Sequence, residues 1–429
     1  MLHHHRHWHG VVKHTIDIFH SRANFSTQIV GEIPILVRDY IHSALYHPNY
    51  GYFSNRPGSV GVLDSSIKFN NLEGRTAYMK LLDKFYKNSN ASWFTPVELF
   101  KPWYAHGIAE AILRTADLSV PLTIYEIGGG SGTCAKNILD YIMLNAPTRV
   151  YNNMTYTSIE ISSSLAEMQK RTVGELRSHS SKFRIECRDA AERSGWGDVK
   201  QQQCWVIMLE VLDNLPHDLI HSENQISEWK EVWIQKKPEW EEPLETHKPV
   251  EDPLIKQCVS LLESESNPSS FVKTIWSKVS PKERRSWLPT GCLKLLSTLH
   301  SVLPKMSLIA SDFTFLPDVI IPGDRAPLIS TKKDGNSWDF KSYLDAKGEA
   351  DIFFPTDFML LEKMDHYCSG WKGASKKGKK RRTLVLDTSA FMEEFGLPSK
   401  TRTKDGYNPL LDDFKNTKVY LSVPTHNIT

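Results

Sequence analysis

The sequence predicts an α/β protein with a Rossmann-like core, and three observations lead to this fold class. From Leu122 onward, short apolar runs alternate with helical patterns, which is typical of a parallel sheet. The first apolar run is followed at once by a glycine-rich turn at Gly128–Gly132, and the next one ends on the acid Glu160. The 429 residues suffice for one large domain or two medium ones with a sizeable core.

The predicted core begins with the strand Leu122–Ile127, and a helix over Thr133–Leu144 follows its glycine turn. Helical spacing of the apolar residues predicts a second helix over Ser164–Leu176, between the next two strands. We place the first part of the core at residues 121–235. The other strands expected in the chain are Met154–Glu160, Phe183–Cys187, Cys204–Leu209, Glu231–Ile234 and Ser307–Asp312.

Two sections flank this first part of the core. Residues 29–120 precede it and form an N-terminal helical section, whose clearest apolar helix spans Leu99–Leu118. Residues 236–290 open with the proline- and charge-rich stretch Lys236–Pro253, so we expect a linker followed by a helical insertion. The helical patches expected after this stretch are Pro253–Glu263 and Leu293–Leu303.

Residues 291–429 form the remainder of the predicted core and contain a basic excursion at 372–382. This run lies between two predicted strands, Phe358–Leu361 and Thr383–Leu386, and we interpret it as a solvated hairpin tip. Contact with RNA or an acidic partner is the alternative, which the balanced overall charge does not favour.

The composition argues against several function classes. A formal net charge of +2 with 24% charged residues lacks the basic excess of a dedicated nucleic-acid binder, so nucleic acid is not an expected partner. The six cysteines are scattered without a CxxC pair, which predicts reduced thiols in an intracellular protein and no metal site. No apolar stretch is long enough to span a bilayer.

The N-terminus has the composition of a mitochondrial targeting segment, which we place at residues 1–28. Asp17 is the one acid before Gly31, against several basic residues and many histidines. A plain disordered tail and a metal-binding tract at His3–His5 are the alternatives.

The turn after the first core strand carries the sharpest chemical signal. Glycines cluster where a ligand approaches the backbone closely, and here they follow the pattern Gly128-x-Gly130-x-Gly132. Thr133 stands where a dinucleotide fingerprint would place its third glycine, so the spacing instead matches the GxGxG turn of S-adenosylmethionine-dependent methyltransferases. This cofactor carries an ammonium and a sulfonium, which suit the acid Glu126 at the strand end.

Two further acids extend the predicted cofactor site. Glu160 ends the second strand, where an acid can accept hydrogen bonds from both ribose hydroxyls. Asp189 follows the third strand, where folds of this kind contact the adenine amino group. An ordinary turn aspartate is the equal alternative for Asp189.

Glu210 and Asp213 follow the fourth strand and are the candidate catalytic residues. Ligands of parallel sheets sit at the carboxyl ends of the strands, so both acids should face the transferable methyl group. Two carboxylates there suit a cationic acceptor such as a guanidinium, which they would align through paired hydrogen bonds. The alternative is that Asp213 caps the next element and that Glu210 is a structural acid.

The ordered motifs along the chain resemble the MidA-like family of mitochondrial complex I assembly methyltransferases, which modify an arginine of a complex I subunit. The resemblance runs in patches from about Val30 to the C-terminus. Its markers are His47–Phe53, Phe94–Pro96, Glu126–Thr133, Ile159–Leu165, Glu210–Pro216, Glu231–Trp233, Ala310–Phe313, Tyr343–Leu344, Gly348–Asp351 and Asp357–Phe358.

The resemblance implies a Rossmann-like methyltransferase core, an N-terminal helical section closing over S-adenosylmethionine, and inserted elements that shape a groove for a protein substrate. It also implies an address in the mitochondrial matrix. Three places depart from the family pattern: the run Ala91–Glu98, Leu209 in place of the family's asparagine before Glu210, and Phe313-Thr314 in place of its Tyr-Gly. The acceptor side is therefore less well kept than the cofactor side.

These observations predict an S-adenosylmethionine-dependent protein arginine methyltransferase acting on a mitochondrial protein during complex I assembly. A weakly active or inactive assembly factor that still binds the cofactor is the alternative. A nicotinamide-dependent oxidoreductase ranks third, because it needs the longer glycine fingerprint that Thr133 interrupts.

Overall fold

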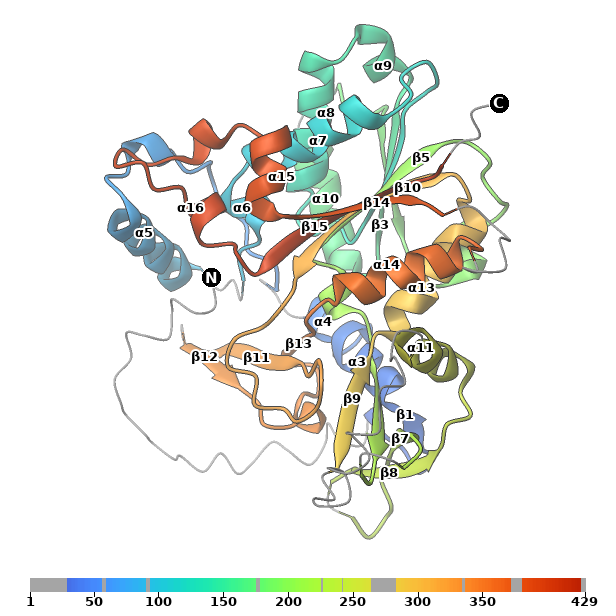
Figure 1. Ribbon diagram of the computed structural model, residues 1–429. Coiled ribbons are helices and arrows are strands. Elements are labelled where there is room, and N and C mark those ends of the chain that lie inside the picture. Colours follow the sequence, from blue (N-terminus) through green and yellow to red (C-terminus); the bar gives the residue numbers. More distant parts are fainter. Residues whose placement is uncertain are drawn as a thin grey trace, which may run out of the picture.

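The computed structural model contains three sheets whose strands interleave in sequence (Figure 1). The largest occupies the upper half of Figure 1, and the two smaller ones lie below it. The residues that the structure describes are 29–55, 59–89, 93–174, 178–224, 227–240, 242–263, 283–333, 336–371 and 380–425.

The seven-stranded sheet is the Rossmann-like core, with strand order β14-β15-β10-β5-β2-β3-β4. Its centre is parallel: Ile127 of β2 lies opposite Ile159 of β3 and Met208 of β5, so these strands end side by side. β15 is the exception, since it runs antiparallel to both β10 and β14. The strands are β2 (Thr123–Ile127), β3 (Thr155–Glu160), β4 (Phe183–Cys187), β5 (Cys204–Leu209), β10 (Met306–Phe313), β14 (Arg382–Asp387) and β15 (Thr417–Val423).

Alternate residues of the central strands face two hydrophobic cores. On β5, Ile207 packs with the helices of one face and Val206 with those of the other. The first face is covered by α7 (Trp103–Thr115), α8 (Thr133–Asn145), α10 (Ser163–Gly174) and α15 (Thr388–Phe395). The second is covered by α11 (Pro253–Glu263), α13 (Thr290–Val302) and α14 (Phe358–Cys368). The core is thus a three-layer sandwich, as predicted for this fold class.

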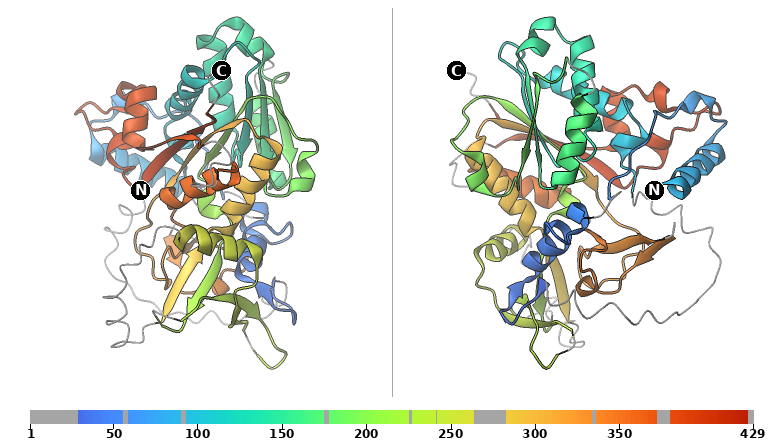
Figure 2. Two further views of the ribbon diagram at one scale, coloured as in Figure 1. Left: turned by 45° about the vertical axis from the view of Figure 1, so that its right-hand side comes forward. Right: turned by 180° about the vertical axis from the view of Figure 1, so that it is seen from behind.

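The two smaller sheets lie beyond the carboxyl ends of the core strands (Figure 2). In the five-stranded sheet, β1 (Ile35–Leu36), β7 (Lys230–Gln235), β6 (Asp218–Ser222) and β9 (Arg284–Leu288) are neighbours, and β8 (Leu244–Pro249) pairs with β7. The three-stranded sheet has the order β12 (Asn336–Asp339), β11 (Leu328–Lys333) and β13 (Asp351–Phe353). Apart from β1, the strands of both sheets lie in sequence between strands of the core. In space the two sheets lie beside the edge of the core at which its parallel strands end (Figure 2).

The section before β2 is mainly helical. Its amphipathic helix α3 (Val37–Tyr46) buries Tyr40 and Ile41 against β6, β7 and β13. Its other helices are α4 (Tyr52–Asn55), α5 (Arg75–Asn88) and α6 (Pro96–Leu99), and the short helices elsewhere are α9 (Thr148–Asn153) and α16 (Pro409–Asp412). Turns of 3-10 helix lie at Phe69–Asn71, Arg193–Trp196, Leu212–Asn214, Tyr343–Asp345 and Pro398–Thr401.

Several sequence predictions differ from the structure. The run Phe358–Leu361 was expected to be a strand but begins helix α14, so the basic excursion at 372–382 is not the tip of a hairpin. Of that excursion only Lys380, Arg381 and Arg382 are described, and Arg381 is buried rather than solvated. The charged stretch 236–253 contains β8, and β7 joins the five-stranded sheet instead of the core.

The predicted targeting segment at 1–28 lies outside the described residues. Within the described part of the chain, no helix is long and apolar enough to cross a membrane. The same residues contain no group of histidine, cysteine and carboxylate side chains arranged to hold a metal ion.

Candidate functional site

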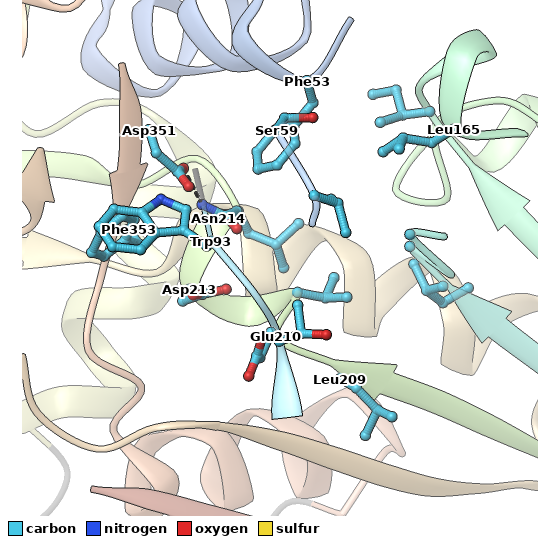
Figure 3. A pocket seen from close by; sticks show the side chains of 18 of the residues that line it. Phe53, Ser59, Trp93, Leu165, Leu209, Glu210, Asp213, Asn214, Asp351 and Phe353 are labelled. Atoms are coloured by element: carbon cyan, nitrogen blue, oxygen red, sulfur yellow. Dashed lines mark hydrogen bonds between the residues drawn. The ribbon is translucent and has the colours of Figure 1, made fainter. Parts of the chain in front are cut away.

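A single cleft of about 1330 Å³ lies at the carboxyl ends of β2, β3 and β5. It is lined by the glycine turn, by the N-terminal helical section, by the loop after β5 and by residues of β11–β13. Ligands of open parallel sheets bind at this edge, close to where the strand order reverses. Figure 3 shows the acids Glu210, Asp213 and Asp351 on one side of the cleft and Leu165, of helix α10, on the other.

The glycine turn closes one end of the cleft with bare backbone. Gly128, Gly130 and Gly132 have φ values of +67°, +53° and +83°, in the left-handed region that favours glycine. A Cβ on Gly130 would meet only Val60 Cγ1, at 3.7 Å, so this position is open toward the cleft. Gly132 does not line the cleft, against expectation: a Cβ there would lie 2.9 Å from Gln169 Cα, so this glycine permits close packing against α10.

Glu126, at the end of β2, is buried at 3% exposure and lines the cleft. One of its oxygens accepts a hydrogen bond from the Tyr156 hydroxyl at 3.0 Å. Burial disfavours the charged form and raises the pKa of Glu126 to about 7, although the bond from Tyr156 opposes the shift. A cation bound beside Glu126 would favour the carboxylate.

Glu160, at the end of β3, is equally buried and is held in place by protein donors. Its two oxygens accept hydrogen bonds from the Ser162 backbone N–H and the Gln169 side-chain amide, each at 3.0 Å. Burial raises the pKa of Glu160 to about 7, and the backbone N–H groups of Ser162 and Gly130 oppose that rise. Each oxygen keeps a second lone pair, so the fixed carboxyl group can still accept from a ligand hydroxyl.

Asp189, after β4, lies on the wall of the cleft opposite α3. Its Oδ1 accepts the Ala191 backbone N–H at 2.7 Å, and its Oδ2 lies 3.7 Å from His42 Nε2. Burial alone would raise the pKa of Asp189, but the interactions with His42 and Ala191 outweigh it and lower the pKa. The structure therefore favours an ionised acid here.

Glu210 combines backbone strain with an unsatisfied buried oxygen. Its φ of +53° is in a region that costs a non-glycine residue free energy and is concentrated at functional sites. Its Oε1 is buried without a hydrogen-bond partner among the described residues, and its backbone N–H donates to Ser311 O at 2.8 Å. Burial, reinforced by the nearby Asp312, raises the pKa of Glu210 well above its ordinary value.

Asp213 is the second acid of this loop and is buried at 5% exposure. Its Oδ1 has no hydrogen-bond partner in the described structure, and its pKa is raised well above the usual value by burial and by repulsion from Asp312, Glu210 and Asp351. Asp312, at the end of β10, holds the loop from below, since its Oδ2 accepts the Asp213 backbone N–H at 3.1 Å. Asp213 lies inside the 3-10 turn Leu212–Asn214, whose N-cap position is Val211, so Asp213 is not the N-cap of that turn.

The structure thus brings together at one cleft Glu126, Gly128, Gly130, Glu160, Asp189, Glu210 and Asp213. Sequence reasoning assigned no role to several residues that complete the site: Trp93, Glu98, Asp312, Asp351 and Phe353. Most of these lie in or beside the family markers, and this was the signal that could have found them.

The residues at the glycine end fit S-adenosylmethionine. The open backbone at Gly130 admits a ligand, and the carboxyl groups of Glu126 and Glu160 offer acceptors for its cationic tail and its ribose. The fit to this cofactor therefore depends on the exposed backbone at Gly130 and on the buried carboxyl groups beside it.

Comparisons with known proteins agree with this geometry. A family model described as "Putative S-adenosyl-L-methionine-dependent methyltransferase" matches residues 107–375. The protein arginine methyltransferase NDUFAF7 homolog, mitochondrial, of Schizosaccharomyces pombe is 24% identical over 328 residues, which cover 70% of this chain and 69% of the relative.

Two solved structures from Burkholderia thailandensis have the same fold. One is titled a "likely methyl transferase" bound to S-adenosyl-homocysteine, with a TM-score of 0.60 and 14% identity over 91% of this chain and 88% of that one. The other, an uncharacterized protein of the same superfamily, has a TM-score of 0.56 and 13% identity over 91% and 87%. The fold is therefore shared with these two bacterial proteins over most of the chain.

Proposed function

Because the chain belongs to the family of S-adenosyl-L-methionine-dependent methyltransferases whose model covers residues 107–375, we propose that it methylates an arginine side chain of a protein. The observation that carries the choice of acceptor is the pair of buried carboxyl oxygens without partners, on Glu210 and Asp213. Buried charged groups are ordinarily paired, so these two acids are suited to bind a cationic ligand.

The glycine end of the cleft is where we place the cofactor. Glu160 would accept the ribose hydroxyls, Asp189 the adenine amino group, and Glu126 would face the cationic end. When bound, S-adenosylmethionine supplies a methyl group on a positively charged sulfur. The open backbone at Gly130 would admit it.

Glu210 and Asp213 would bind the guanidinium and orient it. Arginine is not deprotonated in its resting state, so the carboxylates act first by aligning one nitrogen with the methyl group. Transfer of the methyl group to that nitrogen would break the bond from methyl carbon to sulfur and leave a neutral thioether, and the buried Glu210 carboxylate would accept the proton that the nitrogen loses. The strained backbone at Glu210 fixes the direction of its side chain.

A mitochondrial protein is the acceptor that we propose, and a complex I subunit in particular. Support comes from the name of the fungal relative, which is both mitochondrial and a protein arginine methyltransferase, and from the family resemblance of the motifs. The breadth of the cleft, which extends beyond the glycine end to β11–β13, gives room for a polypeptide. The mitochondrial matrix is the compartment that this proposal requires.

Substitution of Glu210 by glutamine tests the proposal. Glu210→Gln keeps the shape of the side chain but removes its charge, so methyl transfer should fall by at least ~10²-fold, the size typical of a lost acid–base group. Binding of S-adenosylmethionine, measured by calorimetric titration, should be retained. Gly130→Trp is the matched control for the other half of the site, because a side chain there fills the cleft and should abolish cofactor binding.

Mass spectrometry of mitochondrial proteins, with and without the chain, then identifies the acceptor. A methylated arginine that disappears on removal of the chain, and is not restored by Glu210→Gln, supports the assignment. Cofactor binding with no lost methylation would instead favour the cofactor-binding assembly factor. No binding of S-adenosylmethionine at millimolar concentration would refute the cofactor site itself.

A further inference from the structure

We infer that Asp351, Trp93 and Phe353 form the selective half of the acceptor site, which admits a planar guanidinium and discriminates against an ammonium. This inference rests on the proposed function, because it assumes that Glu210 and Asp213 bind the acceptor cation. Figure 3 shows Trp93, Phe353 and Asp351 on the same side of the cleft as those two acids.

The strand β13 presents Asp351 and Phe353 to the cleft. Alternate residues of a strand face opposite sides, and Ile352 between them is fully buried in the core formed with α3. The strand is fastened beside the catalytic loop, because Phe354 N–H donates to Asp213 O at 2.8 Å and Asn214 donates to Asp351 Oδ1 at 2.8 Å. The inserted sheet therefore brings a third carboxyl group to the two acids of the loop.

Trp93 and Phe353 form an aromatic wall next to these acids. Their rings lie edge to face, with centroids 5.8 Å apart and an interplanar angle of 90°. The backbone of Trp93 is fixed by a bridge to Val60 and by the bond from Gly61 N–H to its carbonyl at 2.8 Å. The Trp93 indole N–H is buried without a partner among the described residues, so the site also offers an unused donor.

The wall and the acids act on the same ligand because they line one continuous cleft. Asp213 independently indicates a cationic ligand, since its side chain is more than nine-tenths buried and its Oδ1 has no hydrogen-bond partner among the described residues. The arginines and lysines that line the cleft have other partners. Arg38 pairs with Asp218 and Asp252, Lys87 with Asp83, Lys294 with Glu192 and Arg188 with Glu186, while Lys332 donates to Tyr86 O at 3.2 Å.

A guanidinium fits this combination better than an ammonium does. It is planar and weakly hydrated, it stacks on aromatic faces, and its fork of N–H groups matches carboxylates two at a time. An ammonium is compact and strongly hydrated, and it gains less from an aromatic wall in a closed pocket. The indole N–H is only a donor, so its partner would be an oxygen of the bound peptide rather than the guanidinium.

The test is equilibrium binding rather than turnover. The full-length chain, saturated with S-adenosylhomocysteine, is titrated with a glycine- and serine-flanked peptide carrying a central arginine, and with the same peptide carrying lysine. The wild type should bind the arginine peptide at least ~10-fold more tightly. Trp93→Leu should bring that ratio close to one, whereas Trp93→Phe, which keeps a ring, should keep most of it.

Two further variants separate the wall from the acids. Asp351→Asn, which is nearly isosteric, should weaken the arginine peptide about tenfold, as loss of a charged hydrogen-bond partner does. Trp240→Leu is the matched control, because Trp240 contacts Lys237 outside the cleft and its loss should leave the ratio unchanged. Unaltered affinity for S-adenosylhomocysteine shows that each variant is folded, and Phe353→Leu replaces Trp93→Leu if that variant is not.

The outcomes distinguish this inference from the function on which it rests. An unchanged arginine-to-lysine ratio in both Trp93→Leu and Phe353→Leu overturns the aromatic wall, while arginine binding that is lost in Asp213→Asn leaves the proposed function standing. A wild-type chain that binds S-adenosylhomocysteine but neither peptide overturns the acceptor itself. Selective arginine binding that depends on Trp93 and Asp351 supports both.

Discussion

Glu210 occupies a backbone conformation that stability alone would not select. A non-glycine residue in the left-handed region costs about 1–2 kcal/mol, and this one also buries a carboxyl oxygen without a partner. The cost is understandable if the direction of the Glu210 side chain matters for the acceptor.

Replacement of Glu210 by glycine should therefore stabilise the protein and inactivate it. Glycine adopts φ of +53° without strain, so Glu210→Gly should raise the free energy of unfolding by about 1–2 kcal/mol. Methyl transfer should be lost while cofactor binding remains. Chemical denaturation followed by circular dichroism measures the first effect, and calorimetry the second.

Asp318→Gly is the matched control for this change. Asp318 has nearly the same conformation, with φ of +57°, but does not line the cleft. Its replacement should leave methyl transfer and cofactor binding unchanged, which separates loss of the Glu210 side chain from the change in backbone preference. A Glu210→Gly variant that is less stable than the wild type would contradict the argument that the position is strained.

At the scale of elements, helix α6 is tied to the glycine turn by one buried acid. Glu98 Oε2 accepts the Thr133 hydroxyl at 2.7 Å, while Oε1 accepts the Leu63 N–H at 2.7 Å and pairs with Lys101. Thr133 is the first residue of α8, directly after the turn. The N-terminal section is thus held to the cofactor site through polar contacts as well as through the core.

Glu98→Gln should loosen that connection. The amide places a donor against one of the donors that now bind the carboxylate, so we expect a loss of about 1–3 kcal/mol in unfolding free energy. The affinity for S-adenosylhomocysteine should fall as well, because the turn is no longer held. Glu394→Gln is the control, since Glu394 forms an exposed ion pair with Arg114 and should change stability by less than about 0.5 kcal/mol. Equal effects in the two variants would argue against a positioning role for Glu98.

The elements that were predictable from sequence are those with a local signal. β2 and β5 are short apolar runs bounded by turns, and the glycines after β2 mark the start of α8. The strand predicted at Phe358–Leu361 was wrong because four apolar residues in a row fit either a buried strand or a helix. The Asp357 side chain decides for the helix, since it accepts the N–H groups of Met359 and Leu360, each at 3.1 Å.

The residues of the candidate site likewise divide into those that a local sequence signal predicts and those that it does not. Glu126, Glu160 and Glu210 follow their strands directly, so the sequence predicts their place at the sheet edge. Asp351 and Trp93 are more than 250 residues apart and meet only through the pairing of the inserted sheet, which no local pattern encodes. Likewise, β8 lies in a charged stretch and is a strand because β7 pairs with it.

At the scale of the whole molecule, two kinds of buried acid change the stability of the fold with pH in opposite directions. Burial raises the pKa of Glu126 and Glu160 from 4.5 to about 7, so the stability they contribute is present below pH 4.5 and is lost as the pH rises to about 7. Asp365 has the opposite behaviour. The bonds from His300, Arg381 and Ser422 hold its pKa far below the usual range despite burial, so its contribution is lost only in acid.

The unfolding free energy of the unliganded protein should therefore decline between about pH 4.5 and 7, by a few kcal/mol at most for each raised group. A cationic ligand beside Glu126 favours the carboxylate, so the stabilisation by S-adenosylmethionine should grow over the same range. Thermal unfolding across this range, with and without the ligand, measures both trends. In Glu126→Gln the stabilisation by S-adenosylmethionine should no longer change with pH. A pH dependence that persists in this variant would mean that the cation binds elsewhere.

The position of β15 has a consequence for how the molecule is made. This strand is near the end of the chain yet is hydrogen-bonded between β10 and β14, and Phe414 just before it lines the cleft. A chain emerging from the ribosome consequently exposes the edge of β10 until β15 has been made. Such distant pairings form slowly, and open edges invite aggregation. Because Phe414 and β15 complete this side of the cleft, ligand capture should follow the pairing of β15 with β10.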